Sequence, residues 1–251
     1  MSAANGPIVW AAALLITTAG TTPARAQSRA QRVEISANVG VLAGISTFEE
    51  SRSFPSNGNE TATVTVDHGV KTPLAFSAGG AVRVVRQFWA GVQYAMADMK
   101  SSASISASIP HPILFNAPRT VEGSIDRVAH KEKNVHVDLM YALPAGPVDV
   151  KVMGGPTFFN LKQGFVSDVA LNETYPFDTA SFAGATTKQL SKSAVGFNAG
   201  VDVSYPLSST FRIGALIRYS RADVKFDDPD IGRQTVTAGG VEAGGGIRFR
   251  F

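Results

Sequence analysis

The four histidines are the side chains in this sequence best suited to acid–base chemistry near neutral pH. They are His68, His111, His130 and His136. His136 precedes Asp138 by two residues on one side of an alternating segment, so a strand would separate the two side chains by about 7 Å. That separation is too long for a direct hydrogen bond. We therefore expect a polar pair rather than a catalytic one, and we expect the other three histidines to lie in solvated loops.

Other reaction centres are not indicated. The chain contains no cysteine, which excludes a disulfide scaffold, a thiolate metal site and a cysteine nucleophile. No glycine-rich phosphate loop or cluster of metal ligands is present in the sequence. The net charge of +3 is too small to argue for nucleic-acid binding. The residues therefore predict no enzyme activity, no cofactor and no metal.

The elements that carry these residues alternate apolar with polar or small residues at a period of two, which is typical of β-strands. No segment shows a helical period. Eight such segments occur, at 33–41, 74–84, 88–96, 134–141, 148–152, 195–205, 211–220 and 241–251. The even number is the one expected of an antiparallel sheet that closes on itself.

The connections between these segments alternate in length. Short turns are expected at 86–87, 144–147 and 206–209, and long loops at 46–73, 100–132, 160–192 and 221–235. This alternation is typical of a transmembrane β-barrel and places both termini on the short-turn side. A soluble β-sandwich is the alternative. Aromatic residues near the ends of the apolar faces favour the barrel: Phe88, Tyr94, Tyr141, Tyr205, Phe211, Tyr219, Phe249 and Phe251.

The polar side of the segments predicts the contents of the barrel. An eight-stranded barrel has an interior just wide enough for side chains or one small ligand. The predicted polar network of the lumen consists of Glu34, Arg83, His136, Asp138, Asp149, Lys151, Asp202, Arg212, Arg218, Glu242, Arg248 and Arg250. Acids and bases nearly balance, so we expect paired charges that close the lumen. A wet channel with solvated charges is the alternative.

The first 26 residues have the pattern of a secretory signal peptide. An apolar run at 8–18 is followed by Ala24-Arg25-Ala26, although no lysine or arginine precedes the run. The run is shorter than the roughly 20 residues that a membrane-spanning helix needs. We therefore predict a signal peptide at 1–26 and a mature barrel domain at 27–251.

The C-terminal sequence resembles the end of bacterial outer-membrane proteins, in which an aromatic last residue follows alternating apolar positions. Ile247, Phe249 and Phe251 match this pattern. The whole of 27–251 resembles the small eight-stranded barrels of the OmpA-transmembrane, OmpX and OmpW type. The resemblance implies an all-β, up-and-down antiparallel barrel in the outer membrane, in contact with lipid and lipopolysaccharide. It also implies that the barrel-assembly machinery inserts the chain through its C-terminal signal, and we expect a monomer.

The leading functional hypothesis is a structural and surface-interaction role through the long loops, with an extracellular protein or small solute as ligand. The alternatives are a narrow channel for small solutes, as the OmpW resemblance would imply, and an envelope enzyme that modifies lipid. Thr61–Asp67 and Ser101–Ser108 alternate, so we expect strands to project beyond the membrane. The apolar tripeptide Ile113-Leu114-Phe115 is unusual for an exposed loop and is expected to enter the barrel mouth, bind lipid or contact a partner.

Overall fold

The computed structural model describes residues 32–44, 49–55, 60–69, 72–229 and 231–251. The signal peptide predicted at 1–26 lies outside the described residues. The described strands are β1 (Val33–Ala43), β2 (Glu49–Pro55), β3 (Thr61–Gly69), β4 (Leu74–Val85), β5 (Phe88–Ile109), β6 (Arg119–Ala145), β7 (Val148–Glu173), β8 (Ala180–Pro206), β9 (Phe211–Asp228) and β10 (Gly232–Arg250). No helix long and apolar enough to cross a membrane occurs in this part of the chain.

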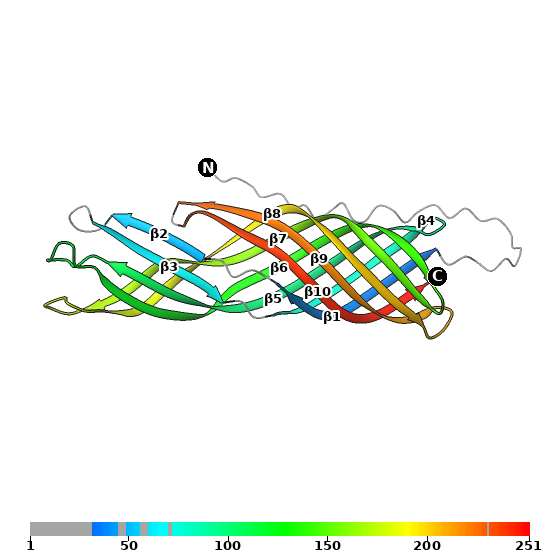
Figure 1. Cartoon of the computed structure of the whole chain (residues 1–251), viewed down its shortest axis with the longest axis horizontal. Coiled ribbons are helices and arrows are strands. Elements are labelled where there is room, and N and C mark those ends of the chain that lie inside the picture. The colour runs from blue at the N-terminus through cyan, green and yellow to red at the C-terminus, as the bar shows by residue number, and fades with distance from the viewer. Residues whose placement is uncertain (1–31, 45–48, 56–59, 70–71, 230) are drawn as a thin grey trace, which may run out of the picture. The chain divides into compact units, whose positions relative to one another are not determined.

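Eight of these strands close into a barrel. Each of β4 to β9 pairs antiparallel with the next strand along the chain, and β1 pairs with both β4 and β10 (Figure 1). The β1–β10 ladder runs from the pair Glu34 and Arg250 to the pair Ala43 and Val241. The expected up-and-down barrel of eight strands is therefore the observed fold, and no edge of the ring is left open.

The start of β1 and the end of β10 meet at one end of the barrel, beside the short turns. The amide of Phe251 donates to the carbonyl of Val33 at 2.8 Å, and the amide of Val33 donates to the carbonyl of Phe251 at 3.0 Å. Gly146 has a φ of 66°, in the left-handed region that favours glycine in tight turns. We call this the short-turn end, and the opposite end the long-connection end.

The outward face of the barrel is an apolar belt with aromatic residues along both margins. Near the short turns, the ring centroids of Phe88 and Tyr141 lie 5.1 Å apart. On the other margin, the rings of Phe197 and Tyr219 lie 6.0 Å apart. On β9 the belt extends from Phe211 to Tyr219, or about 27 Å along the strand, which spans a bilayer core when the strand is tilted.

The long connections are mostly strand rather than loop, so the predicted loops at 100–132, 160–192 and 221–235 are wrong over most of their length. The strands expected to project at Thr61–Asp67 and Ser101–Ser108 are confirmed, as parts of β3 and β5. The alternation continues beyond the belt, with polar or small residues facing outward and apolar residues such as Ile105 and Val121 buried. The expected loop at 46–73 contains the β2–β3 hairpin, whose β3 pairs with β5 from Thr63 and Ser108 to Gly69 and Ser102. The described residues of the hairpin thus widen the sheet at the long-connection end (Figure 1).

Glycines allow the first and last strands to approach closely. A Cβ on Gly246 would lie 1.9 Å from the carbonyl oxygen of Ala37 on β1, and one on Gly40 would lie 2.1 Å from that of Ala243 on β10. Backbone atoms cannot yield as a flexible side chain can. The inward glycines where β1 meets β10 therefore allow the closed sheet to curve.

Candidate functional site

The lumen is the candidate site because charged side chains from seven of the eight barrel strands meet inside it, and β5 adds Trp89 and Gln93. The structure turns the predicted network residues inward. Glu34, His136, Asp138, Lys151, Asp202, Arg212, Arg218, Glu242, Arg248 and Arg250 are buried, and Arg83 and Asp149 are half-buried. The period of two explains this placement, since alternate residues of every strand share one face.

The first group of charges lies near the short turns and joins β1, β7, β9 and β10. The carboxylate of Glu34 accepts hydrogen bonds from Nζ of Lys151 and from Nη2 of Arg250, the latter at 2.6 Å. Asp149 accepts from Nη1 of Arg250 at 2.7 Å and from Arg212. Two acids are thus surrounded by three bases.

Trp89 packs against the same group of cations. Its side chain is only 1% exposed. Nζ of Lys151 lies 4.7 Å from the ring centroid, and the guanidinium carbons of Arg83 and Arg250 lie at 4.9 and 5.3 Å. These distances are those of cation–π contacts. The indole compensates part of the positive excess beside Glu34.

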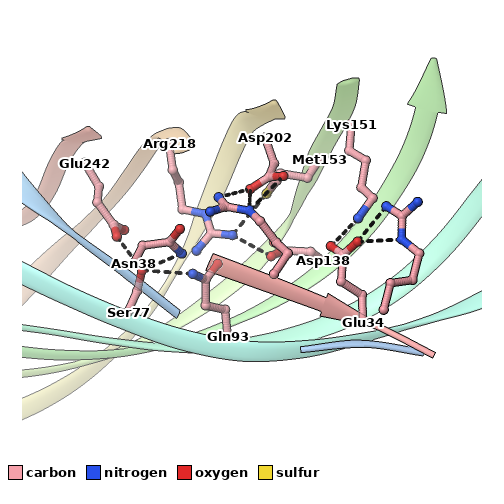
Figure 2. A network of polar contacts seen from close by, with 12 residues as sticks. Glu34, Asn38, Ser77, Gln93, Asp138, Lys151, Met153, Asp202, Arg218 and Glu242 are labelled. Atoms are coloured by element: carbon pink, nitrogen blue, oxygen red, sulfur yellow. Dashed lines mark hydrogen bonds and ion pairs between the residues drawn. The ribbon is translucent and has the colours of Figure 1, made fainter. Parts of the chain in front are cut away.

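Two further ion pairs cross the middle of the lumen. Nη2 of Arg218 donates to Oδ2 of Asp138 at 2.8 Å, and both side chains are fully buried. Nε of Arg248 donates to Oδ2 of Asp202 at 3.2 Å, and its Nη2 binds the same carboxylate. Figure 2 shows that the side chains of Asp138, Asp202 and Arg218 converge from different strands.

Glu242 is held by neutral groups. Its Oε1 accepts a hydrogen bond from the hydroxyl of Ser77 at 2.7 Å. Ser77 Oγ in turn accepts from the amides of Gln93 at 2.9 Å and Asn38 at 3.4 Å (Figure 2). The sequence prediction missed Asn38, Ser77 and Gln93 as network members, although all three lie on the polar side of their segments.

Two of the histidines take positions that differ from the prediction. His136 lies buried on the inward face and forms no described hydrogen bond with Asp138, as their spacing along the strand predicts. Its Nδ1 shares a hydrogen bond of 2.8 Å with the hydroxyl of Thr157. The predicted solvation of His130 and His111 is wrong, since both are buried. His68 belongs to β3, and its side chain lies outside the described residues.

His130 is part of a polar group above His136, because β6 continues where a loop was expected. Its Nδ1 lies 2.5 Å from Oε1 of Gln163, and its Nε2 lies 3.1 Å from Oε1 of Glu132. Glu132 also accepts a hydrogen bond from the amide of Gly239 on β10 at 3.1 Å. No described group of three or more histidines or acids could hold a metal ion.

A small hollow lies between the charged side chains of the lumen. The hollow lined by Glu34, Asn38, Lys151 and Asp202 has a volume of about 20 Å³, which is room for about one water molecule. From the level of Glu132 and Asn134, which lie opposite Leu161 and Phe159, the interior also contains an apolar cluster with Phe165, Val224 and Phe226. The interior is therefore occupied by side chains at more than one level.

The outer face of the barrel indicates the location of the protein in the cell. A closed barrel with an apolar, aromatic-bordered outer face and a polar interior is the structure of proteins in the bacterial outer membrane. The chain is an integral outer-membrane β-barrel. Its short turns face the periplasm and its long-connection end faces the outside.

Solved structures with a similar arrangement include other outer-membrane proteins. Neisserial surface protein A is 12% identical, with a TM-score of 0.42, over 87% of this chain and 97% of that one. OprG of Pseudomonas aeruginosa is 10% identical, with a TM-score of 0.49, over 88% and 96%. The protease OmpT of Escherichia coli is 8% identical, with a TM-score of 0.43, over 88% and 97%. No family model and no curated protein matches the sequence.

Proposed function

We propose that this chain is a non-conducting barrel that binds partners at the cell surface. The observation that carries the proposal is the contrast between its two halves. The lumen is filled by ion pairs, whereas the strands continue outward into a packed body with an exposed apolar tip. We call this body, formed by the β2–β3 hairpin and residues 102–128 and 164–190, the extracellular extension.

The extracellular extension has an apolar core of its own. Val64 and Val66 of β3 and Ile105 of β5 are buried against β6 and β7. Phe182 of β8 packs against the same cluster. Such a core holds strands in fixed positions, as solvated loops would not. The extension therefore supports a preformed binding surface, which binds with a smaller loss of entropy than a flexible one.

The outer tip of the extension combines exposed apolar side chains with fixed loops. Ile113 and Phe115 are 63% and 68% exposed. Arg119 joins the two loops of the tip, through Glu173 at 2.5 Å and the carbonyl of Phe177 at 2.8 Å. The tripeptide thus lies in solvent rather than in the barrel mouth. Exposed apolar groups of this kind mark contact sites.

The alternatives have weaker support. A solute channel would need an open path through the ion pairs of Asp138 and Asp202. An envelope enzyme would need an acid–base pair, but His136 is bonded to Thr157 and Asp138 to Arg218. A cavity of about 600 Å³ lies between the extension and the start of β10, lined by apolar residues such as Ile109 and by charged ones such as Asp168 and Arg233. It adds a site for a small ligand of mixed polarity to the proposed binding role.

The test of this function is cell binding by a tip variant. Cells that display the wild-type protein, I113S/L114S/F115S or the control T120A/E122Q are applied to immobilised matrix proteins, serum proteins and cultured animal cells. We expect the wild type to bind at least one of these targets. The partner would bury the three apolar side chains, so their replacement by serine should weaken that binding by about tenfold or more. The control should show little change. Equal binding by all three proteins would contradict the proposal.

A further inference from the structure

The outward face of β6 and β7 carries a group of lysines immediately above the apolar belt. Lys131 of β6 lies directly opposite Lys162 of β7 in the sheet. Lys133, two residues along β6, lies opposite Asn160. All three lysines are exposed and alternate with buried residues such as Glu132. We call Lys131, Lys133 and Lys162 the lysine group.

This arrangement is unfavourable for the barrel alone. Like charges directly opposite each other on one face of a sheet repel and destabilise the pair. Asp98 of β5 neutralises one member, since it lies 2.5 Å from Nζ of Lys131. Neither Lys133 nor Lys162 forms an ion pair with any carboxylate in the described part of the chain. Two positive charges are therefore left for an anion from outside the protein.

The height of the lysine group on the barrel indicates which anion is available. The next outward residues toward the membrane are Val135 on β6 and Phe158 on β7, which are themselves opposite each other. Phe158 is 48% exposed and belongs to the outer margin of the belt. A lipid whose chains pack against Phe158 places its headgroup one step higher, beside the lysines.

The same level of β8 adds polar groups without negative charge. Ser193 lies opposite Asn160, and Nδ2 of Asn160 donates to its hydroxyl at 3.1 Å. Farther round the barrel, the exposed cations Arg221 and Lys225 of β9 alternate with the exposed acids Asp223 and Asp227. The uncompensated positive charge is therefore greatest on β6 and β7.

We propose that the lysine group binds the phosphate groups of the outer-leaflet glycolipid, lipopolysaccharide. Lys133 and Lys162 supply the two uncompensated charges, and Asn160 and Ser193 lie beside them as neutral polar groups. The site is distinct from the tip of the extracellular extension. Its occupation by lipid offsets the repulsion between Lys131 and Lys162 and fixes the depth of this side of the barrel in the membrane.

The experiment measures lipid binding by the purified, folded protein in a phosphate-free detergent with EDTA. Diphosphorylated lipid A, dephosphorylated lipid A and inorganic phosphate are titrated separately, and lipid-bound protein is counted by native mass spectrometry. Two surface lysines near an anionic headgroup are each worth about fivefold in affinity, so K133Q/K162Q should bind diphosphorylated lipid A about 10- to 30-fold more weakly. The control K225Q/R233Q removes the same charge from exposed outward positions of β9 and β10 and should bind as the wild type does.

A second variant separates lipid binding from folding. K162E places an acid opposite Lys131, so it should raise the unfolding temperature of the lipid-free barrel while abolishing the further rise that diphosphorylated lipid A causes in the wild type. Equal affinity of K133Q/K162Q and the wild type would overturn the proposal. So would equal binding of dephosphorylated lipid A, and inorganic phosphate that competes as well as the lipid would reassign the lysines to free phosphate.

Discussion

Glu34 and Arg250 face each other in the sheet and are also joined by an ion pair inside the lumen, with Nη2 of Arg250 2.6 Å from Oε2 of Glu34. The two residues are 216 positions apart in the sequence. The seam that closes the barrel is therefore held by backbone hydrogen bonds and by a side-chain contact. The ion pair forms only when the first and last strands are in the correct register.

Removal of Glu34 should destabilise the barrel strongly. In E34A, Lys151 loses its carboxylate partner and Arg250 keeps only Asp149. An uncompensated buried charge costs about 3–5 kcal/mol. We expect the free energy of unfolding in urea to fall by that amount, measured by loss of the heat-shifted band on a gel.

The matched control for this prediction removes both members of one pair. E34L/K151M replaces Glu34 and Lys151 by apolar residues of similar volume, and Arg250 still binds Asp149. This double variant should recover more than half of the loss. A fall of less than about 1 kcal/mol in E34A would show that Lys151 and Arg250 are solvated rather than buried.

Trp89 reports on access of solutes to the lumen. The chain has two tryptophans, Trp10 and Trp89, and Trp10 belongs to the predicted signal peptide. In protein that begins at residue 27, fluorescence therefore comes from Trp89 alone. Because Trp89 is 1% exposed, we expect acrylamide to quench the folded protein severalfold less than the urea-unfolded protein. Similar quenching of both forms would indicate an open lumen.

Closure of the barrel should depend on Gly246 and not on Gly245. A Cβ on Gly246 meets the backbone of Ala37 at 1.9 Å, whereas one on Gly245 has no neighbour nearer than the carbonyl oxygen of Gly214 at 3.7 Å. G246A should therefore lower the stability by about 1–3 kcal/mol or prevent folding. G245A is the control and should retain the heat-shifted band. If G246A folds as G245A does, the close approach of β1 and β10 is not required.

Much of the fold could be predicted from the sequence because the period of two is a local property. Val33, Ile35 and Val39 already lie on one face before any tertiary contact is known, and Glu34 lies on the other. The same parity places Arg218 and Arg248 inside the ring. The pairing of each base with a particular acid depends on strand register, which the alternation does not determine.

The ends of the strands were harder to predict. The apolar belt supplies a strong signal where the outward residues are valine and leucine, but it ends at Val135 on β6. Beyond that point Lys131 and Lys133 face outward and resemble loop residues. The buried position of His130 follows only from the continued pairing of β6 with β7, which is a long-range property of the fold.

The central claim is that the ion pairs of the lumen close the barrel, and conductance tests it most directly. Wild-type protein and D138A/R218A, both with a confirmed heat-shifted band, are inserted into planar lipid bilayers and recorded at fixed voltage. The side chains of Asp138 and Arg218 are fully buried and span the middle of the lumen, so their joint removal should produce discrete current steps while the wild type remains silent. Reproducible discrete steps from the wild type would contradict the closed-barrel account and make transport the function to pursue.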